Sequence, residues 1–121
     1  MRFVSIFTFD PTERSGEPDA AAMEKMGALI GEMMASGTLV DTGGVTPTGM
    51  SLRVKGDGKA PISVTDGPFA ESKEIVGGYA VLNVKDRADL LAVTQRFLEC
   101  AGGGTCTIHE LAEMPQADCD R

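Results

Sequence analysis

Apolar residues dominate the first ten positions and predict a strand with two largely apolar faces. One face carries Phe3, Ser5, Phe7 and Phe9, and the other carries Val4, Ile6 and Thr8. Strands of this kind are covered on both sides. In a chain of 121 residues only one side can be served by the chain's own helices. We therefore expect a partner subunit on the other side.

Two longer segments repeat apolar residues at three- and four-residue steps and predict helices. Residues 19–36 form the first, with a stripe of Met23, Met26, Ile30, Met33 and Met34. The second begins after Asp86, a good N-cap, and ends at Gly102. Its inner stripe consists of Leu90, Val93, Thr94, Phe97 and Ala101. We interpret the methionines as adaptable core residues rather than as a cofactor groove.

The remaining apolar runs predict strands over residues 38–42, 51–55, 61–65, 75–84 and 105–111. The glycine-rich residues 43–49 predict a loop. Asp57 and Gly58 form the centre of a hairpin turn that joins the second and third of these strands. Gly77 and Gly78 stand near the start of the fourth strand and indicate either a bulge or the close approach of a ligand or a second chain.

The order of the elements predicts an α+β fold. Strand, helix, strand with a hairpin excursion, strand, helix and strand make a ferredoxin-like split βαβ arrangement, with both helices on one face of an antiparallel sheet. Two such sheets packed face to face across a two-fold axis form a dimeric α+β barrel. We expect a homodimer, with a single domain over residues 1–114 and a loose tail over residues 115–121.

Composition narrows the classes of partner. The formal net charge is −7, and the eleven Lys and Arg residues are scattered. This argues against direct binding of nucleic acid, which needs a clustered positive surface. No apolar run approaches the length of a membrane span or a signal peptide. The sequence predicts a cytoplasmic protein without a membrane partner.

The densest stretch of polar chemistry runs over residues 64–79. Asp66, Gly67 and Pro68 make a strong turn signal, and charged and hydroxyl side chains follow before the next strand. Asp66 either holds a ligand or caps its own turn, and Lys73 either holds an anion or pairs with Glu71 on the surface. The candidate residues for a cleft or ligand site are Asp10, Asp66, Phe69, Glu71, Lys73, Tyr79 and His109.

His109 is the single histidine and therefore the first choice for a general acid or base, with an exposed strand residue as the alternative. Cys106 lies three residues away along a predicted strand, which places the two side chains on opposite faces. Three cysteines without a C-x-x-C motif indicate neither disulfides nor a zinc site. We expect no metal and no cofactor.

The same stretch carries a family resemblance. Residues 65–74, read as Thr-Asp-Gly-Pro-Phe-Ala-Glu-Ser-Lys-Glu, are followed by Gly77, Gly78 and Tyr79. This string resembles the signature of the DGPF branch of the YCII-related family, and the order of elements is similar over residues 2–114. The resemblance implies a ferredoxin-like α+β domain that forms a dimer. Enzymatic members of the broader family are associated with a His and Asp pair whose histidine comes from the first helix; here residues 19–36 contain none.

Three functions remain open. The first is a small-molecule site in the dimer cleft beside the DGPF loop, with lyase-like or isomerase-like chemistry on a polar aromatic or acidic metabolite. The second is a non-catalytic regulatory protein whose partner is an alternative sigma factor, which the resemblance implies. The third is a dimer in which the motif is purely architectural.

Overall fold

The computed structural model describes residues 1–13, 20–46, 49–67 and 74–112. Its elements in chain order are β1 (Arg2–Phe9), the short 3₁₀ turn η1 (Pro11–Glu13), α1 (Ala20–Ala35), β2 (Leu39–Gly44), β3 (Leu52–Lys55), β4 (Ser63–Asp66), β5 (Ile75–Asn83), α2 (Arg87–Ala101) and β6 (Thr105–Glu110). All of the predicted helices and strands are present.

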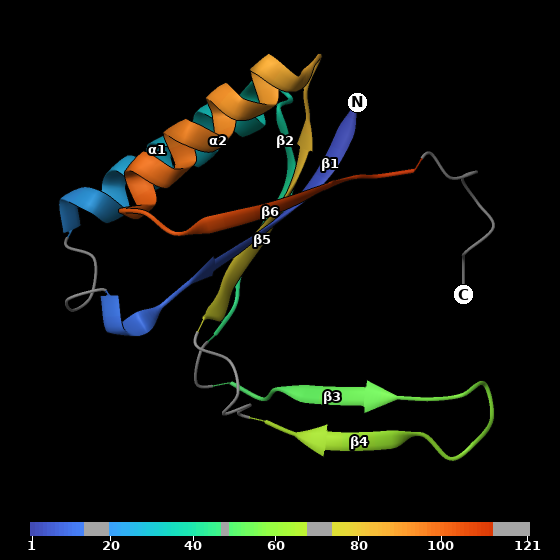
Figure 1. The fold of residues 1–121 in the computed structure, drawn as a ribbon. Coiled ribbons are helices and arrows are strands. Elements are labelled where there is room, and N and C mark those ends of the chain that lie inside the picture. The colour runs from blue at the N-terminus through green and yellow to red at the C-terminus, as the bar shows by residue number, and fades with distance from the viewer. Residues whose placement is uncertain (14–19, 47–48, 68–73, 113–121) are drawn as a thin grey trace.

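The strands form two separate sheets. The main sheet is antiparallel in the order β2-β5-β1-β6, and β3 pairs with β4 alone. Helices α1 and α2 lie side by side on one face of the main sheet, and the β3–β4 hairpin stands beyond its end (Figure 1). The predicted α+β, ferredoxin-like arrangement is therefore confirmed. Among the described residues, no helix is long and apolar enough to cross a membrane.

Helix α2 begins and ends where its local chemistry requires. The Asp86 carboxylate accepts a hydrogen bond from the Asp89 amide at 2.8 Å, which satisfies one of the free N–H groups of the first turn. Gly102 ends the helix at a φ of 83°, and its N–H donates to the Leu98 carbonyl at 3.0 Å. A left-handed residue of this kind at the end of a helix favours glycine.

The core fills the layer between the helices and the sheet. Its buried residues come from both helices, β2, β5 and the segment after β5, and are Leu29, Met33, Leu39, Leu82, Val84 and Leu90. On α1 the buried residues are Leu29 and Met33, whereas the predicted stripe residue Met34 is 49% exposed. Consecutive helix positions are about 100° apart around the axis, so Met33 and Met34 cannot both face the sheet.

The glycine pair of β5 marks a change of register. Phe7 pairs with Gly78 and Thr8 with Val76, so Gly77 is the extra residue of a bulge, as one of the two sequence interpretations predicted. A Cβ on Gly78 would lie 2.7 Å from the Gly43 carbonyl oxygen of β2. Strand β2 accordingly continues through Gly44, beyond the predicted end at residue 42.

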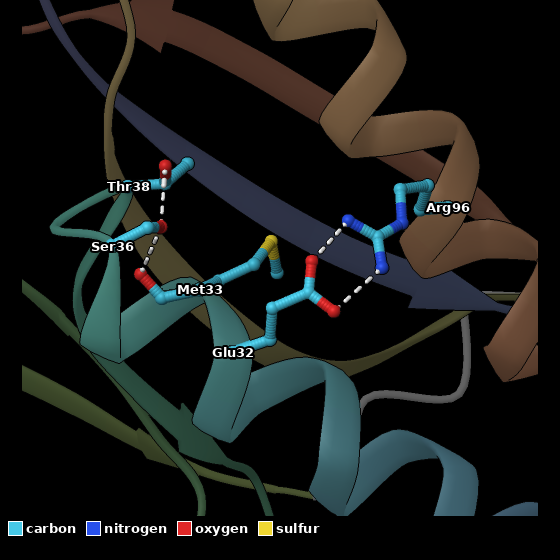
Figure 2. A network of polar contacts seen from close by, with 5 residues as sticks. All are labelled: Glu32, Met33, Ser36, Thr38 and Arg96. Carbon is cyan, nitrogen blue, oxygen red and sulfur yellow. Dashed lines mark hydrogen bonds and ion pairs between the residues drawn. The ribbon is translucent and has the colours of Figure 1, made fainter.

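A bidentate ion pair joins the two helices. The Arg96 guanidinium of α2 donates to both carboxylate oxygens of Glu32 on α1, at 2.7 and 3.1 Å (Figure 2). This contact lowers the pKa of Glu32, first through the hydrogen bonds and then through the charge of Arg96. At the end of α1, the Ser36 hydroxyl lies 3.1 Å from the Met33 carbonyl and 3.0 Å from the Thr38 hydroxyl, which ties the helix to the turn before β2 (Figure 2).

Candidate functional site

A cavity of about 540 Å³ lies between the two helices and the sheet. This is within the volume range of small-molecule sites in proteins. Its walls come from α1, α2 and the helix-facing side of β1, β2, β5 and β6. The residues that characterise it are the apolar Phe7, Met23, Met26, Ile30, Val93 and Phe97 and the small Gly27, Gly43, Gly44, Gly77 and Gly78.

The cavity results from small residues placed where a packed core would need large ones. Gly27 belongs to the part of the wall that α1 contributes, and a Cβ there would have no neighbouring atom within 4 Å. On the sheet side, β2 and β5 contribute four glycines to the wall, and a Cβ on one of them, Gly77, would lie 2.8 Å from the Phe7 ring. The buried core residues Met33, Leu39 and Leu82 also contribute to the wall.

Few polar groups face the cavity. Ser5 is 7% exposed and hydrogen-bonds with the Cys106 thiol of the neighbouring strand. The Thr42 hydroxyl donates to the Tyr79 carbonyl at 2.8 Å, and the Thr94 hydroxyl donates to the Leu90 carbonyl at 2.8 Å. These hydroxyl protons are therefore already engaged within the protein.

No charged side chain belongs to the cavity wall in the described part of the chain. Burial raises the pKa of Cys106, and the hydrogen bond with Ser5 offsets this only in part. A thiol with a raised pKa stays protonated near neutral pH and is a poor nucleophile. Within the described ranges, no three His, Cys, Asp or Glu residues come together as a metal site would require. The wall suits a neutral, largely apolar molecule.

Two predicted site residues are not part of the cavity wall, and one of them stabilises a turn. Asp10 follows β1, and its carboxylate accepts hydrogen bonds from the Thr12 amide at 2.9 Å and the Thr12 hydroxyl at 2.7 Å. The hydroxyl bond, followed by the amide bond, lowers the pKa of Asp10. Asp66 is the last residue of β4, exposed and opposite Leu52 in the hairpin. It belongs to the hairpin rather than to the edge of the main sheet.

Tyr79 and His109 lie on the sheet face opposite the helices. The register pairs Tyr79 with Ile6 and His109 with Val4, and both side chains are exposed. The Tyr79 hydroxyl donates to the Asp41 carboxylate of β2 at 3.1 Å, and this hydrogen bond is the main reason that the pKa of Tyr79 is raised. Strand β1 runs between Tyr79 on β5 and His109 on β6, so the two side chains lie on the same face of the sheet, on either side of β1.

The other three candidates, Phe69, Glu71 and Lys73, lie outside the described residues. Of the polar stretch that precedes β5, Glu74 is described, and its carboxylate accepts a hydrogen bond from the Thr8 hydroxyl at 3.0 Å. The first residues of β5 that contribute to the cavity wall are Gly77 and Gly78. Among the described residues, Tyr79 is the one predicted site residue that contributes to the cavity wall. Its main-chain carbonyl accepts the hydrogen bond from Thr42.

The sequence analysis missed Ser5 and Asp41. Ser5 could have been found as the one small polar residue among the phenylalanines on its face of β1. Asp41 had no comparable signal, because its partner Tyr79 lies 38 positions away and the pairing depends on the order of strands.

A family model of the YCII-related domain matches residues 1–112. The chain belongs to the YCII-related domain family. The match covers all of the secondary-structure elements described above. No curated protein gives a significant match to the sequence. In this YCII-related domain α1 contains no histidine, so the His and Asp pair associated with enzymatic members has no counterpart on that helix.

Proposed function

We propose that this YCII-related domain binds a neutral, largely apolar small molecule in the cavity between its helices and its sheet. The observation that carries the proposal is the cavity of about 540 Å³, whose described wall consists of apolar, glycine and uncharged polar residues. An apolar ligand would gain about 25 cal/mol for each Å² of apolar surface removed from water. A charged ligand would lose its hydration there without an ionic partner.

The proposal changes the expected ligand class from a polar or acidic metabolite to an apolar one. Binding, as by a carrier or a sensor, is the role that the wall supports best. General acid-base chemistry needs a group such as a carboxylate or an imidazole within reach of the substrate, and the described wall supplies neither. A regulatory role beside an alternative sigma factor stays a prediction from the family resemblance.

Gly27 offers a direct test of the site. Gly27→Leu adds four carbon atoms at the cavity wall, at a position where a Cβ would have no neighbour within 4 Å, and Gly31→Leu makes the same change one turn along α1, away from the cavity wall. Both changes remove a helix-interior glycine, which should stabilise the helix by about 0.5–1 kcal/mol. The control therefore matches the helix propensity and differs only in the occupied space.

The assay is a fluorescence titration with N-phenyl-1-naphthylamine, a neutral apolar dye that brightens in apolar surroundings. We expect saturable binding to the parent protein, affinity weakened by about tenfold or more in Gly27→Leu, and affinity within about twofold of the parent in Gly31→Leu. The absence of saturable binding to the parent, or an equal effect of the two substitutions, would contradict the proposal.

We also propose that the protein is a homodimer in which a second copy covers the helix-free face of the main sheet. That face carries half-buried Val4, Ile6 and Val81 and the exposed apolar residues Val76 and Tyr79. Packing a sheet face of this kind against its equivalent across a two-fold axis buries the apolar strip on both copies at once. Sedimentation equilibrium at micromolar concentration tests this, and a monomeric mass refutes it.

A further inference from the structure

Ser5 is a polar residue in the floor of the cavity, on a strand face that is otherwise aromatic. The same face of β1 carries Phe3, Phe7 and Phe9. Ser5 contributes to the cavity wall and is only 7% exposed. A hydroxyl removed from water costs free energy unless a good hydrogen-bond partner replaces the water. The quality of that partner therefore decides what Ser5 can do.

The partner of the Ser5 hydroxyl is a sulfur atom. In the ladder between β1 and β6, Phe7 pairs with Cys106 and Ser5 pairs with Ile108. Ser5 and Cys106 are therefore diagonal neighbours, and both contribute to the cavity wall. Their hydrogen bond lowers the pKa of Cys106 against the larger effect of burial, as expected when the hydroxyl donates to the sulfur. Because sulfur is a weak acceptor, the Ser5 proton is paired only weakly.

The two threonine hydroxyls of the wall have stronger acceptors. The Thr42 hydroxyl donates to the Tyr79 carbonyl at 2.8 Å. The Thr94 hydroxyl donates to the Leu90 carbonyl, also at 2.8 Å. A ligand oxygen that took either proton would replace one strong acceptor by another, with little net gain. A ligand oxygen that takes the Ser5 proton replaces a weak acceptor by a strong one.

We propose that the ligand of the cavity carries a neutral carbonyl oxygen, which accepts a hydrogen bond from the Ser5 hydroxyl. The inference rests on the apolar cavity ligand proposed above and narrows its chemical class to apolar carbonyl compounds. A carbonyl brings an acceptor without a proton of its own, so it adds no donor that the apolar wall would have to satisfy. The Cys106 thiol stays protonated near neutral pH and can donate to the Ser5 oxygen in turn.

The neighbouring rings indicate where the rest of such a ligand lies. Phe7 is two residues along β1 from Ser5, on the same face and therefore about 7 Å away. Its ring meets the Phe97 ring edge to face, with the centroids 5.1 Å apart, and both residues contribute to the cavity wall. Aromatic surface packs favourably against such rings. An aryl ketone with its ring beside Phe7 would thus bring its carbonyl towards Ser5.

Two matched probes test the carbonyl. 2-Acetylnaphthalene is an apolar aryl ketone, and 2-ethylnaphthalene has the same carbon skeleton without the oxygen. Each is titrated as a competitor of N-phenyl-1-naphthylamine on the parent protein, on Ser5→Ala and on Thr94→Val, and circular dichroism reports whether each variant is folded. Ser5→Ala removes only the hydroxyl oxygen. Thr94→Val is the control, because it removes a wall hydroxyl that already has a carbonyl acceptor and keeps the branched shape.

We expect Ser5→Ala to weaken the binding of 2-acetylnaphthalene by about three- to tenfold and to leave that of 2-ethylnaphthalene within about twofold. Thr94→Val should change both affinities by the same factor. A parent that binds neither the dye nor the probes refutes the cavity ligand and the carbonyl together. A parent that binds the dye but not 2-acetylnaphthalene, or a Ser5→Ala variant that weakens both probes equally, refutes the carbonyl alone.

The infrared spectrum of the bound ketone provides a second measurement that does not depend on affinity. A hydrogen bond lowers the stretching frequency of a carbonyl. The frequency of 2-acetylnaphthalene bound to the parent protein should therefore be lower than in an alkane solvent, and Ser5→Ala should raise it towards the alkane value. A frequency in the parent that equals the alkane value, or one that Ser5→Ala leaves unchanged, overturns the proposal.

Discussion

Replacing Gly78 by alanine should destabilise the sheet, whereas the same change at its ladder partner Gly44 should stabilise it. A Cβ on Gly78 would lie 2.7 Å from the Gly43 carbonyl oxygen and 3.4 Å from the Gly44 Cα. The first distance is roughly 0.6 Å short of the carbon-to-oxygen contact of about 3.3 Å seen between neighbouring strands. The obstructing oxygen belongs to the backbone, so β2 and β5 would have to move apart. Overpacking of this kind costs about 1–3 kcal/mol.

The control differs from Gly78 in the space around it. A Cβ on Gly44 would meet nothing closer than the Gly77 carbonyl at 4.0 Å. Removing a strand glycine without a clash gains about 0.5–1 kcal/mol, because the unfolded chain loses conformational freedom. The free energies of unfolding of the two variants should therefore differ by about 1.5–4 kcal/mol.

Urea unfolding followed by circular dichroism, at one protein concentration for all variants, measures this difference. In thermal unfolding, the Tm of Gly78→Ala should fall by about 4–12 °C at this chain length. A Gly78→Ala protein as stable as the parent would show that the close approach of β2 and β5 is not required. Equal shifts in both variants would show that glycine content, rather than the contact, sets the stability.

Two further predictions concern ionisation. Tyr79 is the single tyrosine in a chain without tryptophan, so its ionisation can be followed by absorbance without interference. The pKa of Tyr79 should lie above the ordinary 10.0 in the parent protein and move back towards that value in Asp41→Asn. Identical titration curves for the two proteins would refute the hydrogen bond. The lowered pKa of Glu32 means that the unfolded chain binds more protons as the pH falls below its ordinary 4.5. The stabilisation from Arg96 is thus complete above that value and is lost as the pH drops through the folded pKa. The Tm of the parent should therefore be modestly higher than that of Glu32→Gln near neutral pH, and the two Tm values should converge in acid and in high salt. A difference in Tm that stays constant across pH and salt would contradict a stabilising Glu32–Arg96 ion pair.

Local signals predicted most of the elements. The Asp86 cap and the glycine after residue 101 define α2, and the Asp-Gly centre at residues 57 and 58 defines the hairpin. These signals act between residues a few positions apart, so they can be read without knowledge of the rest of the chain. The two apolar faces of β1 were likewise visible in its run of apolar residues, and the family signature lies in one short stretch.

The candidate site could not be read in the same way. Sequence reasoning gathered charged residues around one turn, whereas the wall of the cavity between the helices and the sheet includes residues without a side chain, such as Gly27 on α1 and Gly77 on β5. A glycine in a helix pattern and a glycine at a strand end look like weak points when each is considered alone. They become a cavity only when the helix is laid over that part of the sheet.

The sequence by itself determined which segments repeat apolar residues as helices do and which as strands do, and it also determined the ends of α2, the hairpin and the family. The tertiary structure decided that β2 continues through Gly44, that Leu29 rather than Met34 is buried, and that Asp41 meets Tyr79. Each of these depends on contacts between segments far apart along the chain. Such contacts are set by the order of strands and by the rotation of a helix on the sheet, which local propensity does not encode.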